Sequence, residues 1–303
     1  MSRAVAWGLL WWLCQAAWAA DPTVLILYPE APPPYQQVFE QIMIGVAQTV
    51  ERSPETLALP PTPDRANIRH WLTARRGAAL LLLGQRALQI YQADWTEGPV
   101  LVGALNALPG QVPWPGVSLV IDPDLYLQTL HEVLPGIERV IAVYHARDDQ
   151  WMSWVQPAAT QRGLRVDPIK VTDTESAVRE LTHVFKTLDP QTTALWFAKS
   201  TLDLNTELLY PFVLEEAWRR KIAVFSDTVA HAKRGFLFAL YPDYKGVGVE
   251  LGQRLHPDVA PMAKGWAFTR AARLALNHRT ARHLGITLRD DVIQRASLLF
   301  PQP

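Results

Sequence analysis

The sequence is nearly free of cysteine, balanced in charge and poor in glycine, and each of these absences excludes a class of protein. Cys14 is the single cysteine, which excludes a disulfide framework and a cysteine-based zinc site. The 29 Lys and Arg residues are matched by 29 Asp and Glu residues, so the surplus of positive charge that nucleic-acid binding requires is absent. Only 16 glycines among 303 residues exclude a glycine-rich fibrous chain.

The motifs of common enzyme classes are also missing. We find no G-x-S-x-G elbow, no H-E-x-x-H helix, no Walker A loop and no G-x-G-x-x-G fingerprint. The eight histidines are scattered, and no pair has the spacing of metal ligands on one helix face. We therefore expect neither an enzyme, nor a metal site, nor a cofactor.

A long apolar run is absent beyond the first twenty residues, and those residues have the pattern of a secretory signal peptide. Arg3 precedes an apolar stretch over 4–13, and Ala17 and Ala19 provide small residues at the positions that signal peptidase recognises. The stretch is too short for a membrane anchor, which needs about 20 apolar residues. Leu13 before Cys14 argues against a lipoprotein. We expect cleavage after about residue 20 and a periplasmic protein.

The chain is 303 residues long, 49% of its residues are hydrophobic, and predicted strands and helices alternate regularly along it. The length favours about two domains. Short apolar runs predict strands at 23–28, 78–83, 100–105, 139–144, 165–171, 194–198 and 222–226. Amphipathic stretches predict helices at 35–51, 64–76, 85–93, 123–134, 151–162, 174–188 and 208–220. This order is typical of an α/β fold with parallel sheets.

The alternation is interrupted once, at Leu108 to Gly116. Three prolines and two glycines in nine residues favour a linker. We therefore predict two Rossmann-like lobes that separate at this segment. Lobe I comprises 21–115 and is completed by a C-terminal segment of about 236–303, and lobe II comprises 116–235.

Three segments carry a resemblance to a known family. They are LHEVLPGIERVIAVYHARD (130–148), RRKIAVFSDTVAHAKRGFLFALYPDYKGVGVELG (219–252) and RTARHLGITLRDDVIQRA (279–296). The chain resembles, over essentially its whole mature length, the ABC transporter substrate-binding proteins of the tryptophan/tyrosine type. The resemblance implies a type 1 periplasmic-binding-protein architecture with parallel sheets and a hinged cleft between the lobes. None of the segments is a catalytic motif, so they specify the fold well and the ligand poorly.

The candidate ligand-binding residues follow from the rule that ligands of open parallel sheets bind beyond the carboxyl ends of the strands. In the first lobe they are Tyr28, Glu30, Gly84, Gln85 and Asn106; in the second they are His145, Arg147, Lys199, Ser200, Thr201, Asp227 and Thr228. Several have a purely structural alternative. Asp227 and Thr228 can cap a helix, Asn106 can form an Asx turn, and Tyr28 can face the core.

The sequence also departs from the family in ways that bear on the ligand. Lys199 brings a cation to a turn that is commonly acidic or amide-bearing in relatives, which puts their aromatic amino acid ligand in doubt. We predict an anionic ligand group at Lys199, with Asp227 or Glu30 holding a cationic group. Trp151 and Trp154 lie three residues apart on one predicted helix and Trp196 lies within a predicted strand, which predicts core packing for these tryptophans. Trp95, Trp114 and Trp266 are the candidates for a groove.

The leading functional hypothesis is a monomeric periplasmic protein that captures a small solute, amino-acid-like or otherwise anionic or zwitterionic, and delivers it to an ABC permease. The alternative is a sensory or accessory binding protein that signals to a membrane receptor or kinase through the same closure. The sequence does not separate these two, since both need a cleft, a hinge and a surface for a membrane partner.

Overall fold

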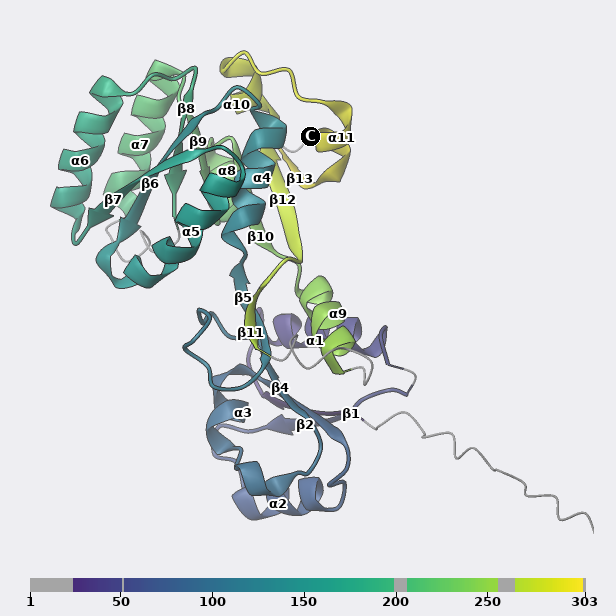
Figure 1. Cartoon of the computed structure of the whole chain (residues 1–303). Coiled ribbons are helices and arrows are strands. Elements are labelled where there is room, and N and C mark those ends of the chain that lie inside the picture. The colour runs from purple at the N-terminus through teal and green to yellow at the C-terminus, as the bar shows by residue number, and fades with distance from the viewer. Residues whose placement is uncertain (1–23, 51, 199–205, 256–264, 302–303) are drawn as a thin grey trace, which may run out of the picture.

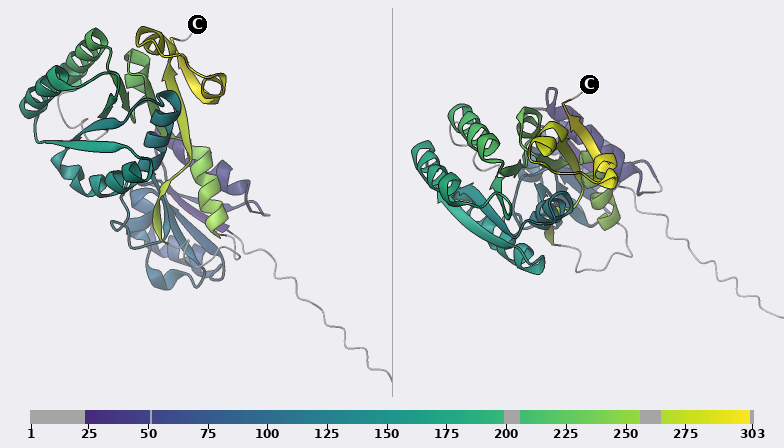
Figure 2. Two further views of the ribbon diagram at one scale, coloured as in Figure 1. Left: turned by 45° about the horizontal axis from the view of Figure 1, so that its top comes forward. Right: turned by 90° about the horizontal axis from the view of Figure 1, so that it is seen from above.

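The computed structural model describes residues 24–50, 52–198, 206–255 and 265–301. The predicted signal peptide therefore lies outside the described residues. Two α/β lobes follow one another along the long axis of the molecule (Figure 1), and Figure 2 shows the same two lobes from two further sides. The α/β class, the two parallel-sheet lobes and the type 1 periplasmic-binding architecture are confirmed.

The first lobe contains a six-stranded sheet in which the strand pairs of the described residues are parallel. In spatial order its strands are β11 (Trp266–Thr269), β5 (Gly116–Ile121), β4 (Val100–Gly103), β3 (Ala79–Leu83), β1 (Val24–Pro29) and β2 (Glu55–Leu59). Its helices are α1 (Tyr35–Ala47), α2 (Arg65–Thr73), α3 (Gly84–Ile90) and α9 (Tyr244–Leu255). Buried clusters lie on both faces of the sheet, which explains why the predicted strands are apolar throughout.

The second lobe contains a seven-stranded sheet. In spatial order its strands are β13 (Ala296–Phe300), β12 (Ala272–Asn277), β10 (Phe238–Pro242), β9 (Ala223–Ser226), β8 (Thr193–Phe197), β6 (Arg139–His145) and β7 (Arg165–Val171). Its helices are α4 (Pro123–Val133), α5 (Asp149–Gln161), α6 (Thr174–Thr187), α7 (Thr206–Arg220), α8 (Val229–Arg234), α10 (His278–His283) and α11 (Asp290–Arg295). In this sheet β12 pairs with β10 in the antiparallel direction, and the other strand pairs of the described residues are parallel.

Local sequence signals account for the predicted helices. Asp64, expected as a cap, accepts hydrogen bonds from the backbone N–H groups of Ala66 and Asn67 at 2.9 and 3.3 Å. Asp122 accepts from the N–H of Asp124 at 3.0 Å, so that Pro123 takes the first helical position of α4. Six of the described strands were not predicted, namely β2, β5, β10, β11, β12 and β13.

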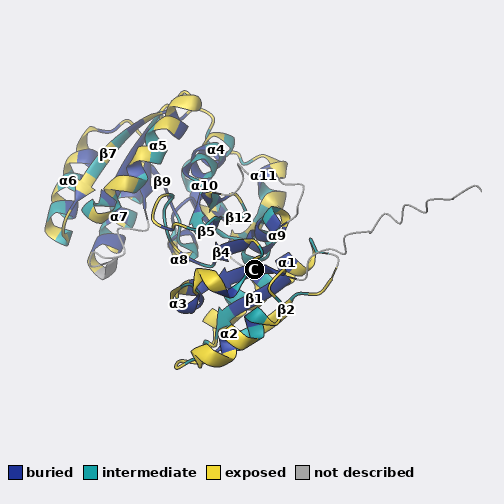
Figure 3. Ribbon diagram, turned by 60° about the horizontal axis from the view of Figure 1, so that its bottom comes forward, coloured by how far each residue is buried: buried dark blue, intermediate teal, exposed yellow. Residues whose placement is uncertain are grey.

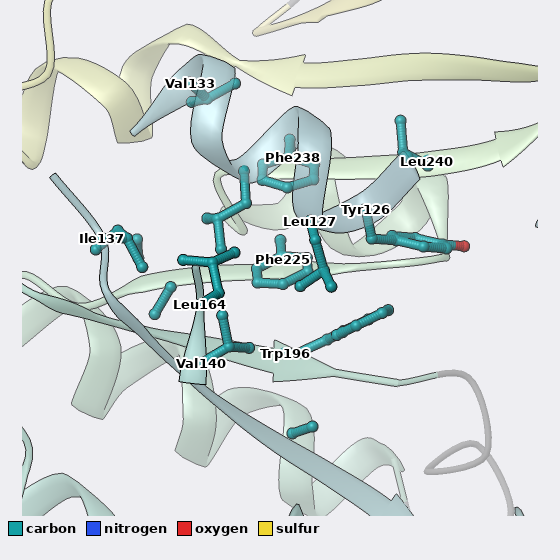
Figure 4. Close-up of a cluster of buried hydrophobic side chains, with 14 of the residues drawn as sticks. Tyr126, Leu127, Val133, Ile137, Val140, Leu164, Trp196, Phe225, Phe238 and Leu240 are labelled. Atoms are coloured by element: carbon teal, nitrogen blue, oxygen red, sulfur yellow. The ribbon is translucent and has the colours of Figure 1, made fainter. Parts of the chain in front are cut away.

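The core of the second lobe is rich in aromatic rings. Figure 4 shows Tyr126 and Leu127 of α4 packed over Trp196, Phe225 and Phe238 of the sheet. The outer faces of the helices are exposed, whereas the strands beneath them are buried (Figure 3). Within the described part of the chain, no helix combines the length and apolar character needed to cross a bilayer.

The prediction that Leu108 to Gly116 joins the lobes is wrong. This segment connects β4 to β5 inside the first sheet. The chain instead passes between the sheets at Asp122, at Asp243 and at Arg270–Ala271, where one strand or helix directly follows another. Prolines and glycines mark where regular structure stops, but they do not tell whether the next strand returns to the same sheet.

The predicted domain limits need two corrections for the same reason. Residues 116–121 form β5 of the first sheet, so the second lobe begins at α4. Among the described residues of the segment 236–303, α9 and β11 complete the first lobe, whereas β10, β12 and β13 pair within the second sheet. The apolar pattern of a strand indicates that the strand is buried, but it does not indicate which strand it pairs with.

Helices α1 and α9 cover one face of the first sheet and lie unusually close together. A Cβ atom on Gly45 would lie 2.0 Å from the carbonyl oxygen of Lys245, and one on Gly248 would lie 2.0 Å from that of Ile42. Both positions therefore require glycine. The contact ties α9, which arrives late in the sequence, firmly to the N-terminal part of the lobe.

Candidate functional site

A cavity of about 430 Å³ lies where the two lobes meet. The first lobe contributes Asn106, Leu108, Gln111, Leu119, Val120 and Ile121, and the second contributes Tyr126, Arg147, Asp148, Trp151, Trp196, Ala198, Asp227 and Pro242. Described residues that follow β6, β8 and β9 line it, as expected for the carboxyl ends of parallel strands. Its volume is in the range of small-molecule sites.

Three aromatic side chains form the wall of the cavity in the second lobe. The ring centroids of Tyr126 and Trp196 are 4.9 Å apart, and those of Trp151 and Trp196 are 5.0 Å apart with nearly perpendicular planes. Trp196 is 1% exposed and also packs against Phe225, with 5.2 Å between centroids. The wall is therefore an extension of the core and is rigid before any ligand arrives.

Charged groups lie beside this aromatic wall. Asp227, which follows β9, lines the cavity together with Arg147 and Asp148, which follow β6. Burial raises the pKa of Tyr126 well above its ordinary value, and the negative charge of Asp227 raises that pKa further. The Tyr126 phenol is thus a neutral hydrogen-bonding group at physiological pH. The second lobe offers a flat apolar surface with both a cationic and an anionic group next to it.

The first lobe forms a more open groove of about 890 Å³ along the carboxyl ends of its own strands. Glu30, Gly84, Gln85 and Asn106 line it, together with Pro32, Tyr35, Pro61 and Pro63 among others. Asn106 lines both the groove and the cavity. The two hollows are therefore adjoining parts of one cleft between the lobes.

The turn that carries Asn106 is held by bonds from neighbouring strands. Ala104 has a positive φ of 58°, an uncommon conformation for a residue with a Cβ atom. The buried Ser118 hydroxyl donates to the carbonyl oxygen of Ala107 at 2.7 Å and accepts from the N–H of Val120 at 2.9 Å. The indole N–H of Trp266 donates to the same Ala107 oxygen at 2.9 Å. These hydrogen bonds hold the backbone next to Asn106 in place, whereas the Asn106 side chain is exposed.

The structure brings some of the predicted residues to the cleft and places others beside it. His145 Nδ1 accepts from the N–H of Arg147 at 3.2 Å, so it shapes the turn after β6. Thr228 is the N-cap residue of α8, and its hydroxyl donates to Asp227 Oδ1 at 3.2 Å. Tyr28 is half-buried and packs on Phe39, with 6.3 Å between ring centroids. Lys199, Ser200 and Thr201 lie outside the described residues, so their predicted role is untested.

Sequence reasoning missed the aromatic wall. Trp151 and Trp196 were predicted as core residues, and Tyr126 was not singled out. Trp196 does belong to the core, but its position as the last residue but one of β8 also brings it to the cleft. Conversely, Trp95, expected as a groove candidate, is 2% exposed in the core of the first lobe, whereas Trp266 is 8% exposed there and also lines a separate hollow of about 610 Å³. A large aromatic residue near the carboxyl end of a strand was an available signal for Trp196, but Tyr126 and Trp151 lie on helices.

Ion pairs connect the segments at which the chain passes between the two sheets. Arg270 donates to Asp122 Oδ2 at 2.8 Å and to Asp124 Oδ2 at 3.2 Å, and thereby connects two of the chain crossings. Arg162 donates to Asp124 Oδ1 at 2.6 Å, and this hydrogen bond is the main reason that the pKa of Asp124 is lowered. The lobes also touch through the rings of Trp154 and Phe268, whose centroids are 5.4 Å apart. Among the described residues no group of three His, Cys, Asp or Glu side chains is arranged to hold a metal ion.

Among the solved structures that share this fold are two that cover more than nine tenths of this chain. One is the ABC domain from Streptococcus pneumonia in complex with L-Trp, with 17% identity, a TM-score of 0.51 and coverage of 92% of this chain and 100% of that chain. The other is the ligand-free, open structure of a substrate-binding protein with adhesive properties from Clostridium difficile, with 12% identity, a TM-score of 0.62 and coverage of 93% and 100%. A comparison with curated proteins finds no match.

The family comparison covers most of the hinge, the second lobe and the cleft. Residues 114–299, more than half of the chain, match the model of the family described as ABC transporter substrate binding protein. This span includes the aromatic wall, Arg147, Asp227 and all three passages between the sheets. The chain therefore belongs to the family of ABC transporter substrate-binding proteins.

Proposed function

We propose that this protein captures a small zwitterionic or anionic solute between its two lobes in the periplasm and delivers it to an ABC permease without changing it chemically. The observation that carries the proposal is the cavity of about 430 Å³ in which an aromatic wall lies beside Arg147 and Asp227. The family match supports binding of a solute as the activity of the chain.

The lining of the cavity favours a ligand with an apolar body and charges at one end. Tyr126, Trp151 and Trp196 provide flat surfaces that contact an apolar or ring-shaped group favourably. Asp227 suits an ammonium group and Arg147 suits a carboxylate. An amino-acid-like solute with a sizeable side chain satisfies all three features. Because the cavity is enclosed by both lobes, closure around such a ligand excludes water and strengthens these charge interactions.

The cation predicted at the turn after β8 belongs to the same proposal. Ala198, which directly precedes Lys199, lines the cavity. A carboxylate bound near this turn meets Lys199 or Arg147, while Asp227 holds the ammonium group. Lys199→Ala is then expected to weaken binding by tens-fold without changing the melting temperature of the ligand-free protein. Isothermal titration calorimetry of the wild type and the variant decides this, and equal affinities would remove Lys199 from the site.

The proposal is tested by a thermal-shift screen of the exported protein with amino acids, peptides, purines, pyrimidines and small organic acids. A ligand that binds only the folded state stabilises it by mass action, by RT ln(1 + [L]/Kd), and so raises the melting temperature. We expect stabilisation by amino-acid-like compounds with large apolar side chains. If no class stabilises the protein and no ligand co-purifies with it, the solute-binding proposal fails. Edman sequencing of the periplasmic product tests export, and an intact Met1 would contradict it.

A further inference from the structure

A second surface of the molecule lies at the edge of the second sheet that faces away from the cleft. Strands β8 and β9 end at the cleft. Helices α7 and α8 end just before β9 and β10 begin, so these helix ends lie at the opposite edge of the sheet. Helix α10 begins at that same edge. These elements touch one another. Thr280 Oγ1 donates to the carbonyl oxygen of Gly235 at 2.9 Å, and the rings of Trp218 and His283 stack with 3.6 Å between centroids. They therefore form one continuous surface.

Five cations are exposed on this surface, which we call the basic pole: Lys221, Lys233, Arg234, Arg279 and Arg282. Among the described residues, none of the five forms an ion pair. The neighbouring cations Arg219 and Arg220 share the one carboxylate of Glu216, at 2.7 and 2.8 Å, so these three groups together add a single positive charge to the surface. The basic pole is thus a local concentration of positive charge on a chain whose formal net charge is zero.

Two of the three guanidinium groups of the basic pole are held against aromatic rings. The Cζ atom of Arg234 is 5.3 Å from the ring centroid of Tyr210, and that of Arg279 is 5.5 Å from the ring centroid of Trp218. Cation–π contacts of this kind limit the conformations of long side chains while leaving their hydrogen-bonding edges accessible. The positive charges are consequently presented at defined positions, and ordering them for a partner costs less entropy.

The hollow that the described residues form at the basic pole is too small for a ligand. The space enclosed between α7, α8 and α10 measures about 10 Å³ and is lined by Leu214, Trp218, Gly235, Thr280 and His283 among others. That volume is too small for a phosphate ion or for a side chain of a bound peptide. Charges spread over three elements without a pocket suit a partner that is extended, flat and negatively charged.

We propose that the basic pole binds the surface of an anionic phospholipid membrane through long-range electrostatic attraction. Each Lys or Arg near such a surface contributes about a fivefold gain in partitioning, and the attraction extends about one Debye length. Because the basic pole and the cleft lie at opposite edges of the second sheet, the membrane contact leaves the cleft open to solute. This inference goes beyond solute capture and does not depend on the identity of the ligand in the cleft.

The experiment measures co-sedimentation of the exported protein with vesicles of phosphatidylcholine alone or mixed with phosphatidylglycerol. We expect binding to the mixed vesicles only, and loss of that binding when salt is raised from about 0.01 M to about 1 M, where the Debye length falls from about 30 Å to about 3 Å. The test variant is Lys233→Gln/Arg282→Gln, which alters neither of the cation–π contacts. Its binding is expected to fall about 25-fold.

The matched control is Arg52→Gln/Lys186→Gln, which removes two exposed cations that form no ion pair among the described residues and lie outside the basic pole. It changes the net charge equally and is expected to bind the vesicles like the wild type. Thermal unfolding verifies that both variants are folded. The proposal is overturned if the wild type does not sediment with the mixed vesicles at low salt or if both variants lose binding equally. Binding to polyglutamate in place of vesicles would assign the basic pole to an acidic protein and would equally overturn it.

Discussion

The two walls of the cleft are built in different ways. The wall in the second lobe consists of Tyr126, Trp151 and Trp196, which belong to or pack against the main core of that lobe. The wall in the first lobe consists of turn residues, among them Glu30 and Asn106, which are exposed and held mainly by hydrogen bonds of the surrounding backbone. We infer that the second lobe provides the preformed binding surface and that the first lobe provides a polar surface that closes over it.

The largest effect on stability and binding is expected for Trp196, which belongs both to the aromatic wall and to the core. Trp196→Ala removes a 1% exposed indole that packs against Tyr126, Trp151 and Phe225. We expect the free energy of unfolding to fall by about 3–5 kcal/mol and ligand binding to be lost. Urea denaturation and calorimetric titration measure the two losses. If stability fell but affinity did not, Trp196 would be a core residue without a binding role.

A buried histidine predicts that the second lobe is sensitive to acid. Burial, and secondarily the charge of Arg234, lowers the pKa of His231 from 6.5 to about 4, and its Nδ1 atom lies 3.1 Å from Ser226 Oγ. Because the folded state disfavours the protonated ring, stability is fully present above pH 6.5 and is lost as the pH falls toward 4. The expected loss is about 2 kcal/mol at pH 5 and about 3 kcal/mol at pH 4.

This acid sensitivity is measured by urea denaturation between pH 7 and pH 4 for the wild type and His231→Gln. The glutamine variant has no titrating ring, so its free energy of unfolding should decline less over that interval. Parallel curves for the two proteins would show that His231 does not couple folding to protonation. Hydrogen exchange resolves the lobes, and we expect amides of the second lobe to lose protection first.

A change to the charge beside the aromatic wall is expected to affect binding and not folding. Asp227→Asn retains the shape of the half-buried side chain but removes its charge. For a ligand with an ammonium group, affinity should fall by tens-fold, equivalent to about 2 kcal/mol, because a desolvated charge pair is broken. Ala230→Ser is the control, since Ala230 is exposed in the first turn of the following helix α8 and does not line the cavity. Comparable affinity losses in both variants would argue for a disturbed turn and against a charge interaction.

The smallest expected effect concerns the polar wall of the first lobe. Ser118→Ala removes the hydroxyl that connects Ala107 to Val120 and should destabilise the protein by about 1–2 kcal/mol. If Ser118 acts on the ligand by positioning Asn106, its effect on affinity should vanish in an Asn106→Ala background. Calorimetric titration of the two single variants and the double variant measures this coupling. Additive losses would mean that Ser118 affects the site by another route.

The comparison of the two walls also shows where prediction from sequence succeeded. The polar candidates after strand ends, such as Glu30, Gln85, Asn106, Arg147 and Asp227, do line the cleft, because the position of a strand end is visible in a single sequence. The aromatic wall was not predicted as a binding surface. An aromatic residue in a strand has the same local pattern whether its far end meets the core or a cavity.

The sequence by itself determined the α/β alternation, the helix caps such as Asp64 and the strands of continuous apolar character, since these depend on residues close together in the chain. Only the tertiary structure decided that β5 belongs to the first sheet, that β10, β12 and β13 belong to the second, and that Trp196 meets Tyr126. The physical reason is that the choice of strand partner and the place where two lobes meet depend on contacts between distant segments. Their energies are set by the whole packing arrangement, and the pattern of any one segment does not contain them.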